Sequence, residues 1–192
     1  MNQDIKNLRG DAIKVIEQSI KNQNNPLLNV NNMFGKLESL LSVGDNIGKK
    51  KKISMAGKMA KSFKLGKGGS QIIKNGLGKA VLLLKSAKGN TQLKIDNIDK
   101  LLLQSTLLNT TDEKDLSSLN DITEALKTSK SMNVEMIGFL NNIASIIEKS
   151  KNSKEETNIA NLSKFLEESA SDALNKIKNY QEKSTELLKK IS

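Results

Sequence analysis

Apolar residues recur at steps of three and four along most of this chain, and that spacing is the strongest constraint on its fold. The longest example repeats every seven residues, at Leu119, Leu126, Asn133, Leu140 and Ile147. The alternate positions hold Leu116, Ile122, Met136, Ile137 and Ile143. Such spacing places side chains on one face of an α-helix, whereas a half-buried strand would alternate with a period of two. We therefore expect an all-α protein without β-sheet.

Boundary residues divide this pattern into helices. We expect helices over residues 4–23, 26–43, 53–65, 71–88, 90–109, 112–149 and 153–192. The second starts at Asn25-Pro26, a cap followed by proline at the first helical position. Glycines at 66–69 and at Gly89 are expected to end helices, since glycine costs about 1 kcal/mol relative to alanine in a helix interior. The helix over 112–149 would break, if anywhere, near 129–133, where its apolar seam turns polar.

The last two helices suggest an elongated bundle. Ser153 and Glu156 form a capping box, and the final helix then keeps its 3,4 spacing to the C-terminus through Leu166, Ile177 and Ile191. Because the junction before Ser153 is short, we expect a long antiparallel helical hairpin with coiled-coil-like packing. We divide the chain into an N-terminal helical pair (1–45), a basic segment (46–95) and a long-helix stalk (96–192).

The net positive charge of the protein comes from that basic segment. Residues 46–95 contain 13 Lys and no Asp or Glu. Removing these from the 31 basic residues of the chain leaves 18, against 21 acidic residues, so the formal charge of +10 belongs to one region. The segment favours a partner with a negatively charged surface.

On a helical wheel the basic segment forms an amphipathic helical hairpin. In residues 53–65 one face carries Met59 and Phe63 while lysines occupy the other. A basic amphipathic helix is typical of elements that lie on membrane surfaces. We predict that the following residues bind the membrane or another anionic surface: Lys49, Lys50, Lys51, Lys52, Lys58, Lys61, Lys64, Lys67, Lys74, Lys79, Lys85, Met59 and Phe63. The alternative is a pair of ordinary bundle helices whose lysines are merely solvated.

Catalytic chemistry has little support in the sequence. The chain contains no Cys and no His, which removes thiolate chemistry and the commonest general base and metal ligand. No phosphate-binding loop is present, and the acidic clusters stand at helix starts or on polar faces, where dipole compensation and solvation explain them. We expect a protein that is not an enzyme and has no cofactor and no metal site.

These observations support three functions. The leading one is a non-enzymatic helical protein that binds anionic lipid through residues 53–88, with a layout similar to that of helical pore-forming and membrane-remodelling proteins. The second is a structural or adaptor bundle that forms homo-oligomers or binds partner helices through its long helices. The third is non-specific nucleic-acid binding, which the absence of Arg and the single aromatic residue of the segment disfavour. Without a signal peptide or transmembrane helix, we expect a cytoplasmic, peripheral-membrane or signal-independently exported protein.

Overall fold

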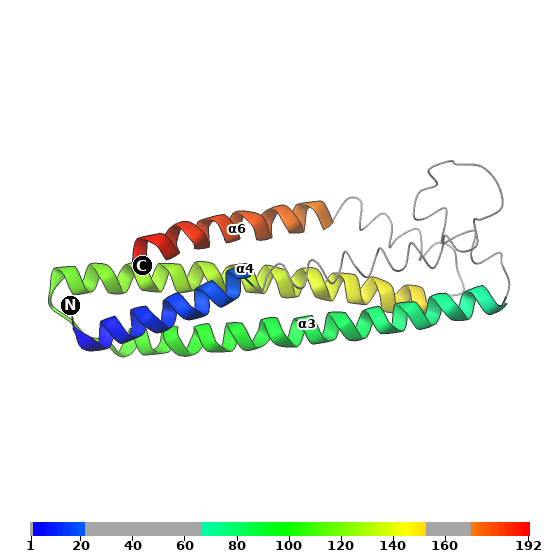
Figure 1. Cartoon of the computed structure of the whole chain (residues 1–192), viewed down its shortest axis with the longest axis horizontal. Helices are drawn as coiled ribbons and strands as arrows, with labels where there is room; N and C mark the ends of the chain where they lie inside the picture. Colours follow the sequence, from blue (N-terminus) through cyan, green and yellow to red (C-terminus); the bar gives the residue numbers. More distant parts are fainter. Residues whose placement is uncertain (1, 22–66, 153–169) are drawn as a thin grey trace. The chain divides into compact units, whose positions relative to one another are not determined.

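The computed structural model describes residues 2–21, 67–152 and 170–192, and they form four helices and no strand. These are an N-terminal helix (residues 3–21), α3 (Lys67–Leu107), α4 (Glu113–Asn152) and α6 (Ala170–Ile191) (Figure 1). The predicted all-α fold is confirmed. The helices expected over 26–43 and 53–65, and the Ser153 capping box, lie outside the described residues.

The chain divides into two compact units, and both α3 and α4 contribute to each. Unit 1 comprises Met1–Asn24, Lys88–Gly138 and Ala173–Ser192, and unit 2 comprises Asn25–Ala87 and Phe139–Asp172. The three-part division expected from composition remains a prediction, as do the elongated hairpin and its coiled-coil packing.

Asparagine and aspartate side chains start two of the helices. Asn2 Oδ1 accepts a hydrogen bond from the backbone N–H of Asp4 at 2.9 Å. At the start of α4, Asp112 Oδ1 accepts one from the N–H of Asp115 at 3.0 Å. Both are N-caps, which satisfy N–H groups that have no partner inside the helix. The cap-rich junction expected around residues 110–113 is therefore present.

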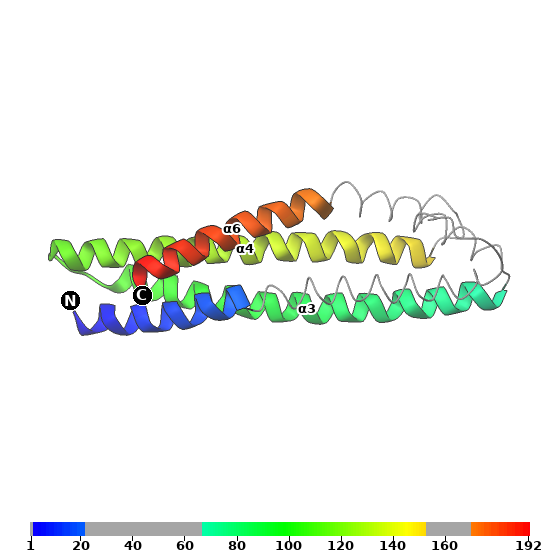
Figure 2. The ribbon, with the colours of Figure 1, turned by 45° about the horizontal axis from the view of Figure 1, so that its top comes forward.

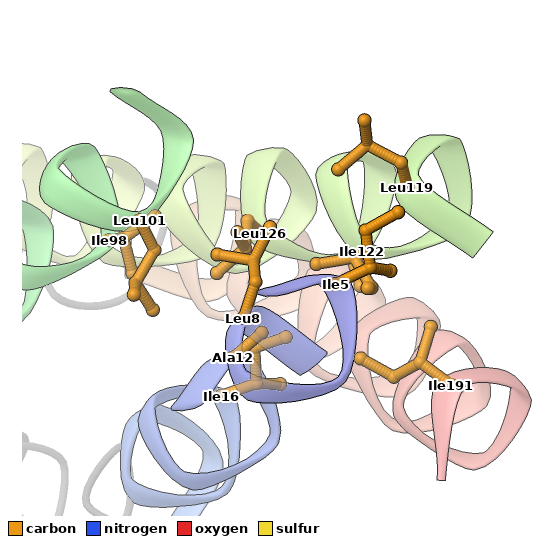
Figure 3. Packing of buried hydrophobic residues seen from close by; sticks show 11 residues of the cluster. Ile5, Leu8, Ala12, Ile16, Ile98, Leu101, Leu119, Ile122, Leu126 and Ile191 are labelled. Atoms are coloured by element: carbon orange, nitrogen blue, oxygen red, sulfur yellow. The ribbon is translucent and has the colours of Figure 1, made fainter. Parts of the chain in front are cut away.

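The core of unit 1 is built from all four helices. Figure 3 shows its aliphatic side chains converging from the N-terminal helix, α3, α4 and α6. The buried members of this cluster are Ile5, Leu8, Ala12, Ile16, Ile98, Leu101, Leu119, Ile122, Ala125, Leu126 and Ile191. Each fully buried aliphatic side chain contributes about 1.5–3 kcal/mol, so the apolar stripes seen in the sequence hold this unit together.

Ion pairs fix the directions of the helices within unit 1. Five residues (108–112) connect α3 to α4, and Lys130 Nζ of α4 lies 2.7 Å from Asp99 Oδ1 of α3. On the other side of α4, Lys190 pairs with Asp121 at 2.7 Å and Lys183 with Glu124 at 3.7 Å. Because the higher-numbered lysine of α6 meets the lower-numbered acid of α4, α6 and α4 run antiparallel (Figure 2).

Two expected helix interruptions are absent. α3 continues through Gly89, where we predicted a stop, and α4 continues through Ser129–Asn133. Buried positions on α3 keep helical spacing on both sides of Gly89, at Val81, Leu84, Ala87, Thr91, Ile95 and Ile98. Packing along this stripe outweighs the cost of about 1 kcal/mol for one glycine. In α4 the Asn133 amide donates to the Ser129 carbonyl at 2.8 Å, so the buried amide has a partner within the helix.

The seven-residue pattern of α4 is confirmed, whereas several other leucines are not core residues. Leu119, Leu126, Asn133, Leu140 and Ile147 are all buried. By contrast Leu116, which we placed on the apolar face of α4, is 48% exposed, and Leu93 and Leu107 of α3 are 62% and 72% exposed. Each of these leucines lies outside the face of its helix that packs against other helices. Apolar spacing along the sequence does not distinguish such exposed leucines from buried ones.

Candidate functional site

The structure describes four of the residues predicted to bind an anionic surface. Lys67 and Lys74 lie in the first turns of α3, and the side chains of Lys79 and Lys85 are exposed. The remainder lie outside the described residues: Lys49, Lys50, Lys51, Lys52, Lys58, Lys61, Lys64, Met59 and Phe63. The described part of the candidate site is therefore the part of the basic segment that lies in α3.

An apolar pair lies between the two exposed lysines of unit 2. Leu82 is 68% exposed and Leu83 is 48% exposed. Lys79 precedes Leu82 by three residues and Leu83 by four, so one turn of helix places the lysine beside both leucines. Lys85 follows on the other flank of Leu82. We call these four residues the Lys79–Lys85 patch.

The opposite face of this part of α3 is buried. Val81 and Leu84 are 7% and 3% exposed, and Ala87 is also buried. Leu83 lies at the exposed edge of this buried face. Three consecutive leucines at 82–84 point in directions about 100° apart on a helix, so a single neighbouring surface cannot cover all of them. That geometry is a signal in the sequence that at least one of the three leucines is exposed, although it does not identify which one.

The lysines of the patch keep most of their charge available. Lys85 Nζ lies 3.6 Å from Glu148 Oε1 of α4, and both side chains are at least half exposed. Exposed pairs of this kind contribute about 0–1 kcal/mol, so Glu148 holds Lys85 weakly. Lys79 has no ion-pair partner among the residues described. An approaching anionic surface would therefore meet two exposed leucines, the weakly paired Lys85, and Lys79, for which the described residues offer no ion-pair partner.

Unit 1 has a small polar pocket whose charged side chains take part in contacts between helices. It has a volume of about 90 Å³ and is lined by Arg9, Ser118, Asp121, Ile122, Lys190 and Ile191. Arg9 Nε donates to the carbonyl of Ile191, and Arg9 Nη2 donates to that of Ser192 at 2.6 Å. A hydrogen bond from Lys190 to Asp121, together with their charge attraction, raises the pKa of the Lys190 ammonium. The groups that could bind a ligand here already bind one another.

Among the described residues, no group of three or more acidic side chains is arranged to hold a metal ion. No helix in the same residues combines the length and the apolar character needed to cross a bilayer. Comparison with protein-family models, with curated proteins and with solved structures gives no match to this chain.

Proposed function

We propose that this protein is a non-enzymatic helical protein that docks reversibly on anionic membrane surfaces through residues 53–88 of its basic segment. The observation that carries the proposal is the exposed Leu82–Leu83 pair flanked by Lys79 and Lys85, in a segment without a single acid. Lysines attract the surface, and the leucines enter the region between headgroups and acyl chains. In this proposal Lys79 and Lys85 bind the anionic surface, as the sequence predicted. The predicted contribution of Met59 and Phe63 is part of the same proposal.

Typical magnitudes favour reversible docking. A Lys near an anionic leaflet contributes about 1 kcal/mol, and a fully buried leucine contributes about 1.5–3 kcal/mol. Partial insertion of Leu82 and Leu83 together with a few lysines therefore suffices for measurable binding. This binding free energy is far smaller than that of a membrane-spanning helix, so binding should be reversible. Because lysines supply part of it, binding should fall steeply as salt concentration rises.

Nucleic acid is the closest alternative target for the charge. Phosphate binding by counterion release needs lysines alone, and it leaves exposed leucines without a role. A lipid surface uses both kinds of side chain in the Lys79–Lys85 patch, which is why we prefer it. An adaptor bundle would need neither the charge nor its confinement to one segment.

Flotation with liposomes separates these alternatives. The full chain should float with vesicles that contain anionic lipid and remain in solution with neutral vesicles. The double variant L82S/L83S should lose most vesicle binding while keeping its helical circular dichroism, because both side chains are exposed. L116S removes a leucine of equal exposure to Leu83 from α4 and serves as the matched control.

Two outcomes would overturn the proposal. If L82S/L83S floats like the unmodified chain, the leucines do not insert. If neither the unmodified chain nor L82S/L83S floats with anionic vesicles while both bind DNA equally well, the target is nucleic acid. K79E should weaken vesicle binding by about 2 kcal/mol, since it removes one attraction and adds one repulsion.

A further inference from the structure

The part of α3 that belongs to unit 1 carries a second seam, with three leucines and a pair of opposite charges, on its solvent-exposed face. Its positions follow steps of four and three and are all exposed: Gly89, Leu93, Asp96, Lys100, Leu103 and Leu107. The three leucines are 62%, 63% and 72% exposed. Alternating steps of three and four are the pattern by which two helices pack along a shared seam. We call this set the outer seam of α3.

The outer seam does not stabilise unit 1 itself. The buried seam of the same helix runs through Thr91, Ile95, Ile98, Leu101 and Ser105. At 100° per residue the two seams lie on opposite sides of α3. One buried seam is sufficient for a helix to pack into a bundle. The outer seam is therefore available for a contact outside this unit.

We propose that the outer seam binds the outer seam of a second copy of this chain in antiparallel orientation. The register that matches the side chains pairs residues whose numbers add to 196. Leu93 then faces Leu103 of the second copy, and Asp96 faces Lys100. Leu107 faces Gly89. Two-fold symmetry repeats each of these contacts, so every position of the seam has a partner.

Charge complementarity selects this partner and orientation. Neither Asp96 nor Lys100 forms an ion pair among the described residues; the Gln92 amide donates to Asp96 Oδ1 at 2.9 Å. In the antiparallel register the two copies form two Asp96–Lys100 contacts. A parallel, in-register pair would instead place Asp96 against Asp96 and Lys100 against Lys100. Like charges in a seam are repulsive, so the parallel arrangement is disfavoured.

Gly89 provides an independent argument for the register. A Cβ added at Gly89 would have no atom within 4 Å, so packing inside the chain does not require glycine here. Glycine in a helix interior nonetheless destabilises the helix relative to alanine. In the proposed register the absent side chain leaves space for Leu107 of the second copy. The glycine therefore has a role in the dimer that it lacks in the monomer.

Charge exchange tests the pairing directly in the full-length chain. Sedimentation velocity should show a dimer for the unmodified protein, and D96K and K100D should each lose it. The double variant D96K/K100D restores opposite charges at both contacts and should recover the dimer. V134E replaces an exposed apolar residue of α4 and should dimerise normally. A monomeric unmodified protein, or a double variant that fails to recover while remaining helical, would overturn the proposal.

Cysteine crosslinking tests the register, because the chain contains no natural cysteine. An equimolar mixture of L93C and L103C chains should form a disulfide-linked dimer on mild oxidation, whereas either variant alone should form far less. Crosslinking of L93C with itself at the level of the mixture would indicate a parallel pair and contradict the proposed register. This inference does not depend on membrane binding, and the vesicle experiments do not test it.

Discussion

The backbone N–H of Asn2 donates a hydrogen bond to the Asp115 carboxylate at 2.8 Å, across 113 positions of sequence. Asn2 caps the N-terminal helix, and Asp115 lies in the first turn of α4, where its own N–H is bound by Asp112. One buried carboxylate thus joins the starts of the N-terminal helix and α4 within unit 1. A carboxylate near a helix N-terminus is also favoured by the helix dipole.

Replacing Asp115 by alanine should destabilise the protein by about 1–3 kcal/mol, the usual cost of removing a charged acceptor from a buried hydrogen bond. Urea unfolding of the purified variant measures this change. E113A, at an exposed position of the same helical turn, is the control and should change stability by less than about 0.5 kcal/mol. Equal stability of D115A and the unmodified chain would show that this bond contributes nothing.

The only arginine of the chain should be irreplaceable by lysine. Arg9 uses two different nitrogens to bind two carbonyls at the end of α6, at Ile191 and Ser192. A lysine ammonium is a point charge and cannot reproduce this forked geometry. We expect R9K to lose about 1 kcal/mol or more of stability. Hydrogen exchange should localise the loss to the last turns of α6, and unchanged protection there would contradict this role.

Removing a buried hydroxyl should stabilise unit 1. The hydroxyls of Ser19, Ser129 and Ser184 are buried and make no hydrogen bond in the structure. An unpaired buried polar group costs about 1–3 kcal/mol, and alanine also has the higher helix propensity. S129A should therefore raise the free energy of unfolding by about 0.5–2 kcal/mol, measured by denaturant titration. A loss of stability would mean that the hydroxyl has a partner in solution.

Lys94 should make stability depend on alkaline pH. Partial burial lowers the pKa of its ammonium below the ordinary value of 10.5. The native state therefore disfavours the charged form, and this penalty is present at neutral pH and disappears as pH rises through the native pKa toward 10.5. K94M should raise the urea midpoint at pH 7, and its advantage should shrink near pH 10.5. A constant advantage at both pH values would show that the gain comes from packing alone.

The fold class was predictable because apolar spacing alone determines it. The repeat through Leu126, Leu140 and Ile147 is buried throughout, and so are Ile5 and Ile16 in the N-terminal helix. Helix ends were less predictable at glycines. The expected stop at Gly89 rested on a propensity of about 1 kcal/mol, which burial of the side chains on either side outweighs. Propensity is local, whereas this packing involves helices distant in sequence.

The candidate site was predictable in its charge and only partly in its apolar residues. The concentration of net positive charge in residues 46–95 is visible in the sequence. Which of three consecutive leucines faces outward depends on where α4 lies, and this is decided by tertiary packing. The outer seam could not be predicted from the sequence for the same reason. The spacing of Leu93 and Leu107 also fits a buried helix face, and only tertiary packing shows that they are exposed.

Fluorescence of a single tryptophan at position 82 tests the membrane proposal most directly. The chain has no natural tryptophan, so L82W reports from the Lys79–Lys85 patch alone. L116W, at an exposed position of α4, is the matched control. We predict that anionic vesicles shift the L82W emission to shorter wavelength while neutral vesicles do not, and that L116W keeps its emission in both. An L82W emission that anionic vesicles leave unchanged, although the protein remains folded, would contradict insertion of this surface into a membrane.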